Sequence, residues 1–235
     1  MIGVVSFPGS NGDHDALHSL TADIGCAARL VDFRETELAG LTAIVLPGGF
    51  SYGDHLRCGA IARFAPVMAA VRRFAEAGGA VLGICNGFQV LTEANLLPGA
   101  LLRNRTLRFH CQRVHIVVER VDTAWTSGLG KGEVLSLPVA HGDGAYFADE
   151  MTLAAVERDG QVVARYCDLK GNISLESNHN GSLSSIAAIT NQNRNIVGMM
   201  PHPERATSNL IGGSDGVRLL RAGLATLSQQ MAEAR

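Results

Sequence analysis

The chain contains 235 residues, 46% of them hydrophobic, and carries a formal charge of -2 at pH 7. A chain of this size and apolar content can bury a substantial core, so we expect one domain over residues 1–235. The nearly balanced charge gives no reason to expect binding to nucleic acid or to an anionic membrane surface.

The N-terminus and the cysteine content predict a cytoplasmic protein. Residues 1–7 lack the basic segment of a signal peptide and lead into a turn at Pro8-Gly9, so we interpret them as a first strand. The apolar runs are far too short to cross a membrane. The five cysteines are an odd number without paired spacing, which is typical of reduced thiols and not of a disulfide framework.

The first half of the chain alternates short apolar runs with helical patterns. Such alternation is typical of βαβ units, in which helices cover both faces of a parallel sheet. We therefore expect an α/β fold with a mostly parallel central sheet and helices on both of its faces. The predicted strands in this half are residues 4–7, 28–31, 43–46 and 80–84, and the predicted helices are residues 13–24, 61–77 and 87–94.

The middle of the chain carries short β-like runs that are separated by polar turns. These runs, at residues 114–118, 133–137, 153–157 and 162–166, predict a smaller antiparallel β extension beside the parallel sheet. Two later runs, at residues 185–188 and 195–199, are predicted to return to the main sheet. The spacing of the apolar residues then predicts a C-terminal helix over residues 216–231.

An apolar run ends at Cys85, which has one glycine two residues before it and another two residues after it. Strand, sharp turn, reactive side chain and helix in this order form a nucleophile elbow. The glycines allow the strained turn and the close packing around it. At a helix N-terminus, free N–H groups and the helix dipole favour a thiolate. We therefore predict that Cys85 is a nucleophile in acyl transfer through a covalent intermediate.

A cysteine nucleophile needs a base, and the base needs a group that orients it. The segment Pro201-His202-Pro203-Glu204 follows a predicted strand and contains both types of residue. The two prolines hold the segment extended, and residues two positions apart then project to the same side. We predict that His202 is the base and that Glu204 orients it.

Acyl transfer also needs donors for the developing oxyanion, and these are normally backbone N–H groups. One candidate is the N–H of Asn86, directly after the nucleophile. The second is Gly49, in the turn that ends a predicted strand, where glycine lets the backbone direct its amide toward the site. Open α/β sheets gather their sites at the carboxyl ends of the strands, where both segments are predicted to lie.

These motifs together resemble the class I, or triad, glutamine amidotransferases. The residues that carry the resemblance are Gly83-x-Cys85-x-Gly87-x-Gln89 and the later His202-x-Glu204. Longer segments, at residues 7–11, 46–54, 56–63, 138–144 and 199–206, are similar to the small glutaminase subunits of phosphoribosylformylglycinamidine synthases. The chain departs from that family at Asp143, where glutamate is usual.

The resemblance implies an activity that spacing alone does not. The chain would hydrolyse glutamine to glutamate and ammonia, with Cys85 as nucleophile, His202 as acid and base, and Glu204 as orienting carboxylate. Gln89 matches the family's substrate-side glutamine, and His141 is a second candidate for substrate binding.

The resemblance also implies partners. The ammonia would pass to a large synthetase subunit, together with a small accessory subunit, and this synthetase converts formylglycinamide ribonucleotide to its amidine in purine synthesis. ATP and Mg²⁺ are expected in that synthetase and no cofactor is expected in this chain. The sequence agrees, because the Gly130-Lys131 pair has Trp125 where a P-loop needs its first glycine. His55 and Cys58 have a metal-ligand spacing but no further ligands nearby, so we predict no metal site.

Two other interpretations of the site stay open. An elbow cysteine also occurs in cysteine hydrolases and peptidases of related α/β folds, and a non-catalytic chain that only stabilises a synthetase is the second alternative. A run of arginines is either a solvated face or a docking surface for the synthetase; its members are Arg103, Arg105, Arg108 and Arg113.

Overall fold

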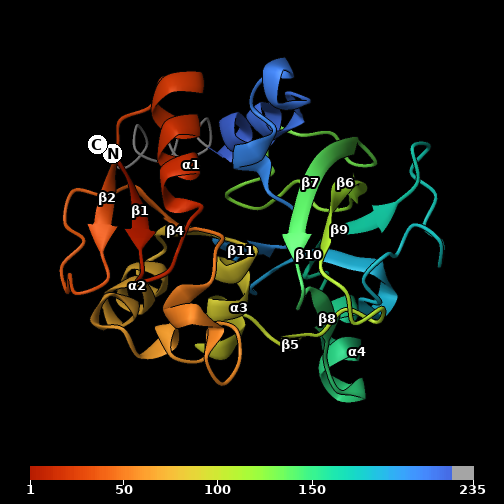
Figure 1. The fold of residues 1–235 in the computed structure, drawn as a ribbon, viewed down its shortest axis with the longest axis horizontal. Coiled ribbons are helices and arrows are strands. Elements are labelled where there is room, and N and C mark those ends of the chain that lie inside the picture. Colours follow the sequence, from red (N-terminus) through yellow and green to blue (C-terminus); the bar gives the residue numbers. More distant parts are fainter. Residues whose placement is uncertain (224–235) are drawn as a thin grey trace.

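A computed structural model describes residues 1–223 as layers of helices around a mixed sheet (Figure 1). The strands are β1 (Ile2–Ser6), β2 (Ala28–Asp32), β3 (Ala43–Leu46), β4 (Ala80–Ile84), β5 (Ala100–Leu102), β6 (His110–Val118), β7 (Val134–His141), β8 (Ala145–Phe147), β9 (Val162–Cys167), β10 (Ile186–Thr190) and β11 (Ile196–Met199). The α-helices with both ends described are α1 (Asp13–His18), α2 (Pro66–Glu76), α3 (Asn86–Glu93) and α4 (Glu150–Arg158). Nine strands form one sheet in the order β2-β1-β3-β4-β11-β10-β9-β6-β7, and β5 pairs with β8 separately.

The part of the sheet from β2 to β11 is parallel throughout. Strands β3 and β4 are buried along their whole length, because helices cover both faces of this part. Figure 1 places α1 on one side of these strands and α2 with α3 on the other. The predicted α/β class, with its parallel strands and two covered faces, is confirmed.

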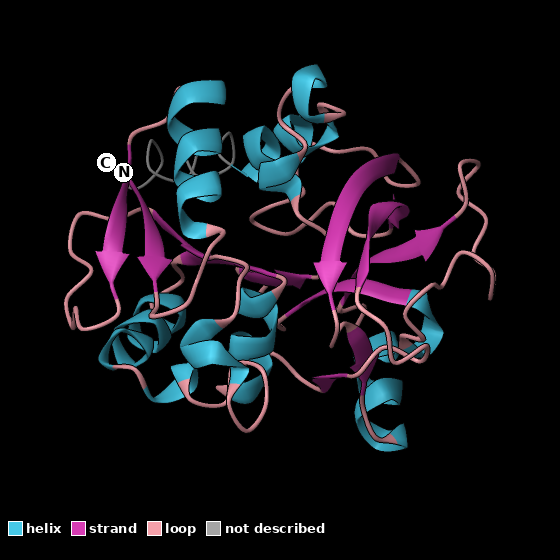
Figure 2. Cartoon of the chain, in the orientation of Figure 1, coloured by secondary structure: helices cyan, strands magenta, loops and turns pink. Residues whose placement is uncertain are grey.

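The antiparallel extension continues the same sheet and does not form a separate layer (Figure 2). Strand β10 pairs antiparallel with both β11 and β9, and β6 pairs antiparallel with β9 and β7. The predicted return of the chain to the main sheet is confirmed, since β11 lies beside β4.

The strand predicted at residues 153–157 is wrong, because these residues lie in α4. The side chain of Asp149 accepts a hydrogen bond from the N–H of Thr152 at 2.8 Å and caps the helix. Of the helix residues only Val156 is buried. A short apolar run with a single buried residue does not distinguish a helix from a strand. Here the N-cap at Asp149 favours the helix.

Two predicted helices differ in detail from the structure. The helix predicted over residues 61–77 begins as α2 at Pro66, because Ala65 before the proline is held extended (ψ 142°) and only a short turn precedes it. Residues 215–223 are helical, and the remainder of the predicted C-terminal helix lies outside the described residues. Within residues 1–223 no helix has the length and apolar content needed to cross a membrane.

The adjacency of β4 and β11 positions the candidate site. Gly83 pairs with Gly198 and Ile84 with Met199, so the two parallel strands end side by side. The N–H of Cys85, just past β4, donates to the carbonyl of Met199 at 2.8 Å. The residues that follow each strand therefore leave the sheet at the same carboxyl edge.

Candidate active site

Cys85 occupies a strained turn between β4 and α3. Its backbone has φ 51° and ψ -103°, a left-handed conformation that is unusual for a residue other than glycine. A Cβ on Gly83 would lie 2.7 Å from the carbonyl oxygen of Gly87, and a Cβ on Gly87 would collide with the carbonyl of Leu46. The two glycines therefore let strand, turn and helix pack closely enough to hold the thiol at the helix N-terminus.

His202 and Glu204 form a buried pair past the end of β11. His202 Nδ1 and Glu204 Oε1 are 2.6 Å apart, and the two side chains are 2% and 1% exposed. The backbone N–H of His202 donates to the carbonyl of Pro138 on β7 at 2.8 Å, which fixes where the ring enters the site. Within the described chain the other ring nitrogen, Nε2, has no hydrogen-bond partner. One nitrogen is thus held by a carboxylate while the other is left for chemistry.

Gly48 lies against both Cys85 and His202. A Cβ at this position would be 2.6 Å from His202 Cε1 and 3.5 Å from Cys85 Cβ. The imidazole and the cysteine side chain therefore border the same small space, more than a hundred residues apart in sequence. Burial by itself lowers the pKa of His202, but the charges of Glu204 and Cys85 outweigh burial and raise this pKa to about 10.

The two candidate oxyanion donors belong to the turn after β3 and to the first turn of α3. Gly49 has φ 138°, which an L side chain rarely adopts, and a Cβ there would lie 2.6 Å from the backbone nitrogen of Asn11. Asn86 is the first residue of α3, where a backbone N–H has no acceptor within the helix. The two segments are linked directly, since the N–H of Ser51 donates to Asn86 Oδ1 at 3.1 Å.

Gln89 lies one helical turn after Cys85 and is buried. Its Nε2 donates to the carbonyl of Asp143 at 2.6 Å, and its Oε1 accepts from Asn86 Nδ2 at 2.9 Å. The amide therefore ties α3 to the loop of residues 141–144.

His141 is buried and its ring is turned into the protein. Nδ1 lies 3.1 Å from Asn104 Oδ1, and the ring packs beside His110 and His179, with centroids 6.3 and 5.8 Å away. Burial first, and then the neighbouring His179, lower the pKa of His141 to about 3. The ring is therefore neutral at physiological pH, and its environment is that of a residue that shapes the loop.

The sequence did not point to Asn104, which organises the same loop. This fully buried side chain donates to the carbonyls of His141 and Arg108 and accepts from the N–H of Gly144. It lies outside every motif, within the arginine run, and only tertiary structure shows its contacts. Cys58, which the sequence marks only for its spacing from His55, contacts the same loop. Its thiol lies 3.3 Å from Asp143 Oδ2, and burial, followed by Asp54 and Asp143, raises the pKa of that thiol.

Among residues 1–223 no cluster of three or more His, Cys, Asp or Glu side chains is arranged to hold a metal ion. His55 and Cys58, which have a metal-ligand spacing in the sequence, are therefore not joined by a third ligand in this part of the chain.

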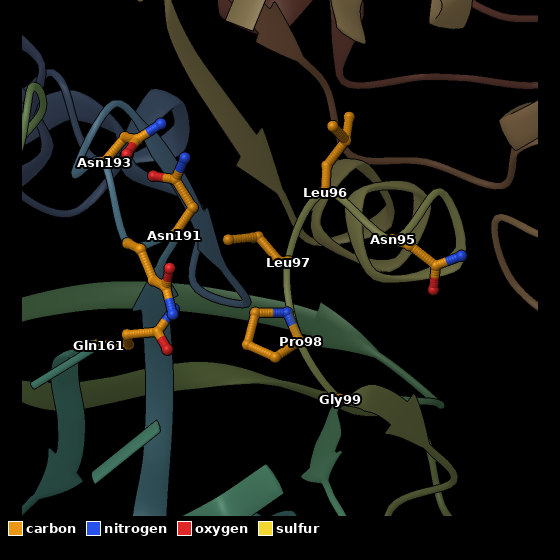
Figure 3. Close-up of a pocket in the computed structure, with 9 residues that line it drawn as sticks. Asn95, Leu96, Leu97, Pro98, Gly99, Gln161, Asn191 and Asn193 are labelled. Atoms are coloured by element: carbon orange, nitrogen blue, oxygen red, sulfur yellow. The ribbon is translucent and has the colours of Figure 1, made fainter. Parts of the chain in front are cut away.

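The cavity in Figure 3 lies away from the cysteine. It has a volume of about 490 Å³ and lies beside the turn that precedes β11, at the opposite end of that strand from His202. Two of its polar side chains are already engaged: Gln161 Nε2 donates to the carbonyl of Thr190, and Asn191 Nδ2 donates to Asn195 Oδ1. None of the residues that line it is a predicted site residue.

The chain is similar over most of its length to proteins of one family. The model of the CobB/CobQ-like glutamine amidotransferase domain matches residues 1–212. The chain is 56% identical to phosphoribosylformylglycinamidine synthase subunit PurQ of Thermomicrobium roseum, over 94% of both chains, and 56% identical to that of Gloeobacter violaceus, over 95% of this chain and 96% of the other.

The solved structures extend the comparison. A chain in the structure of PurLQS from Thermotoga maritima superposes with a TM-score of 0.85 at 41% identity, covering 96% of this chain and 98% of that one. A GMP synthase-like protein from Thermoplasma acidophilum superposes with a TM-score of 0.63 at 14% identity, over 100% and 98% of the two chains, and shares the fold alone.

Proposed function

Since the chain belongs to the CobB/CobQ-like glutamine amidotransferases, as a glutaminase subunit of phosphoribosylformylglycinamidine synthase in purine biosynthesis, we propose that Cys85, His202 and Glu204 carry out its glutamine hydrolysis. The observation that carries this assignment is the buried His202–Glu204 pair, with 2.6 Å between Nδ1 and Oε1, whose imidazole borders the same space beside Gly48 as the Cys85 side chain. The match of the family over residues 1–212 supports the expectation that residues 1–235 form one amidotransferase domain.

The chemistry begins with the Cys85 thiolate. Its sulfur bonds to the side-chain amide carbon of glutamine, and the carbonyl electrons move onto oxygen. Protonated His202 gives its proton to the amide nitrogen, the carbon–nitrogen bond breaks, and ammonia leaves a glutamyl thioester on Cys85. His202, now neutral, takes a proton from water as the water attacks the thioester, and glutamate leaves with the thiol regenerated. Glu204 holds the ring and stabilises its charged form throughout.

We assign the oxyanion hole to the backbone N–H groups of Gly49 and Asn86. One donor belongs to the turn after β3, and the other belongs to the first turn of α3, directly after the proposed nucleophile. Donors that are fixed before the reaction need no rearrangement when charge develops, and each contributes about 2.7–4 kcal/mol to transition-state stabilisation.

The loop of residues 141–144 is proposed as a wall of the glutamine pocket. Gln89 supports it through the carbonyl of Asp143, and His141 anchors it from within. Both residues named as substrate-side candidates thus act on the same loop, and direct contact with glutamine is assigned to its two partly exposed residues, Gly142 and Asp143.

The ammonia is proposed to pass to a large synthetase subunit with a small accessory subunit. The solved relative from Thermotoga maritima is described as PurLQS. ATP and Mg²⁺ are assigned to the synthetase, because this sequence lacks a P-loop. We place the complex in the cytoplasm, in agreement with five free cysteines.

The docking face is proposed to surround the mouth of the site. Phe50, directly after Gly49, stacks on Phe109 with ring centroids 6.5 Å apart, and both residues are about half exposed. Neighbouring exposed aromatic rings are typical of protein interfaces, whereas leaving them in contact with water is unfavourable. Leu107 beside them is 76% exposed. The arginine run flanks these residues, so the partner face is expected to combine apolar and acidic groups.

The assignment is tested by Cys85→Ala in the reconstituted complex. Glutamine-dependent synthesis should be lost while synthesis from added ammonium continues, because only the ammonia source is removed. Cys26→Ala, at a half-buried cysteine outside the proposed docking face, serves as the matched control and should keep both activities. A glutamine-analogue electrophile should label Cys85 alone. Retained glutamine use by Cys85→Ala would refute the assignment.

A further inference from the structure

The side chain of Asn86 is buried between the turn after β3 and helix α3, and it is 1% exposed. Its position next to the nucleophile draws attention to its backbone N–H, but the side chain makes contacts of its own. These contacts reach both segments that supply the proposed oxyanion donors.

All the polar groups of this side chain are engaged. Oδ1 accepts from the N–H of Ser51 at 3.1 Å, and Nδ2 donates to Gln89 Oε1 at 2.9 Å and to Asp54 Oδ1 at 3.2 Å. The orientation of the amide is unambiguous. A flipped amide would place its NH₂ group against the Ser51 N–H and its oxygen against the carboxylate of Asp54.

The segment that Asn86 holds is conformationally strained. Three consecutive residues, Tyr52, Gly53 and Asp54, have φ of 54°, 69° and 52°, and Gly49 has φ 138°. Such a run persists only when surrounding contacts over-determine it. Asn86 binds this segment at both ends, at Ser51 and at Asp54, and the segment begins two residues after Gly49, whose N–H is the proposed donor.

We propose that Asn86 is a positioning residue. Its side chain holds the turn after β3 next to the start of α3, so that the backbone N–H of Gly49 stays oriented to donate to the oxyanion. The proposal rests on the function given above and deepens it, since this side chain acts through the turn and does not touch substrate. Through Gln89 the same network continues to the carbonyl of Asp143. One amide thereby fixes the oxyanion turn and the loop of the proposed glutamine pocket together.

The network also explains why asparagine is needed. Aspartate would keep the acceptor for Ser51 but would set a carboxylate against Asp54, whose own pKa burial already raises, and against Gln89 Oε1. Alanine would leave the Ser51 N–H and the Gln89 oxygen without partners in a buried place.

The test compares Asn86→Asp with the wild-type chain in the synthetase complex. The kcat for glutamine hydrolysis should fall about 10- to 100-fold, less than the roughly 10²- to 10³-fold that removal of a whole donor costs, with KM changed less than about threefold. Alkylation of Cys85 by iodoacetamide should keep its wild-type rate, because that displacement forms no tetrahedral oxyanion. Adding Asp54→Asn should restore several-fold of the lost kcat by removing the opposed charge.

Asn195→Asp is the matched control, because Asn195 is also buried and donates from Nδ2 to two backbone carbonyls, those of Ala75 and Gly79. It should lower the melting temperature without lowering kcat below the transition. Wild-type kcat in Asn86→Asp, or kcat and alkylation falling together, would overturn the proposal. Failure of the proposed function itself would appear separately, as glutamine hydrolysis that survives Cys85→Ala.

Discussion

Glu204→Gln removes the charge from the buried His202–Glu204 pair while it keeps the shape of the side chain. Nδ1 and Oε1 are 2.6 Å apart and both side chains are almost fully buried, so solvent cannot replace the lost charge. Burial lowers the pKa of His202, and Glu204 is the main group that overcomes burial and raises this pKa to about 10. Without the carboxylate this pKa should fall, because only Cys85 remains to oppose burial. A smaller share of the ring would then be in the imidazolium form that protonates the leaving amide nitrogen.

The size of the effect follows from the pKa. A rise from 6.5 to about 10 stabilises the charged ring by roughly 5 kcal/mol, at about 1.4 kcal/mol per pKa unit. Breaking a buried pair by changing one partner typically costs about 3–5 kcal/mol of folding stability. The pKa of His202 is higher in the folded chain than in the unfolded chain. The contribution of the pair to the free energy of unfolding is therefore complete below about pH 6.5, declines as the pH rises, and is lost above about pH 10.

The assay is denaturant unfolding of both chains at several pH values between about 6 and 10.5, a range that spans the unfolded and folded pKa of His202, together with glutamine hydrolysis in the complex. The wild-type chain should exceed Glu204→Gln by about 3–5 kcal/mol near pH 6, and the difference should shrink steadily toward pH 10. The variant's kcat should fall by about two to four orders of magnitude. An unfolding difference that stays constant across this pH range would refute the argument, because it would show that His202 carries no extra proton in the folded chain.

Two further predictions test other parts of the site. Gly48 does not have a positive φ, so alanine fits its backbone without strain. Gly48→Ala should nevertheless lower kcat at least about 100-fold, because the added Cβ would lie 2.6 Å from His202 Cε1 and displace the ring. An unchanged kcat with an unchanged denaturation midpoint would contradict this. Phe109→Glu should weaken binding of the synthetase at least about tenfold, measured by titration of labelled chain, while Cys85 still reacts with iodoacetamide; full binding would remove this ring from the proposed docking face.

The sequence predicted the features of the site that are local. The glycines around Cys85 specify the elbow because the turn and the helix that it needs lie within five residues, and the structure shows the expected left-handed backbone at Cys85. The His202–Glu204 contact is equally local, but the prediction of an extended segment is only partly right. His202 is extended, whereas Pro203–Arg205 form a short 3-10 helix, and this turn brings the two side chains together. Their roles in catalysis stay a prediction that the experiments above address.

The features that the sequence did not predict depend on partners distant in the chain. The strand predicted at residues 153–157 is wrong because the apolar pattern of these residues fits a strand and a helix equally well. The N-cap at Asp149 favours the helix. Asn104 and Asn86 carry no motif that announces their side-chain contacts, which involve residues 30–40 positions away. Hydrogen-bond partners of this kind are fixed by the packing of loops, and no period or spacing in the sequence records them.

The neighbouring strands β4 and β11 explain how residues so far apart in the chain can cooperate. Gly83 and Gly198 are partners in register, and both face α3: a Cβ on Gly83 would lie 2.5 Å from Leu91 Cδ1, and one on Gly198 would collide with the ring of Phe88. Because neither glycine has a side chain, α3 packs closely against the sheet at this point. This close packing positions the turn at Cys85 at the same edge of the sheet where the chain leaves β11 toward His202. The sequence shows the glycine at 83 as part of the elbow, but the reason for glycine at 198 emerges only when the two strands are seen side by side.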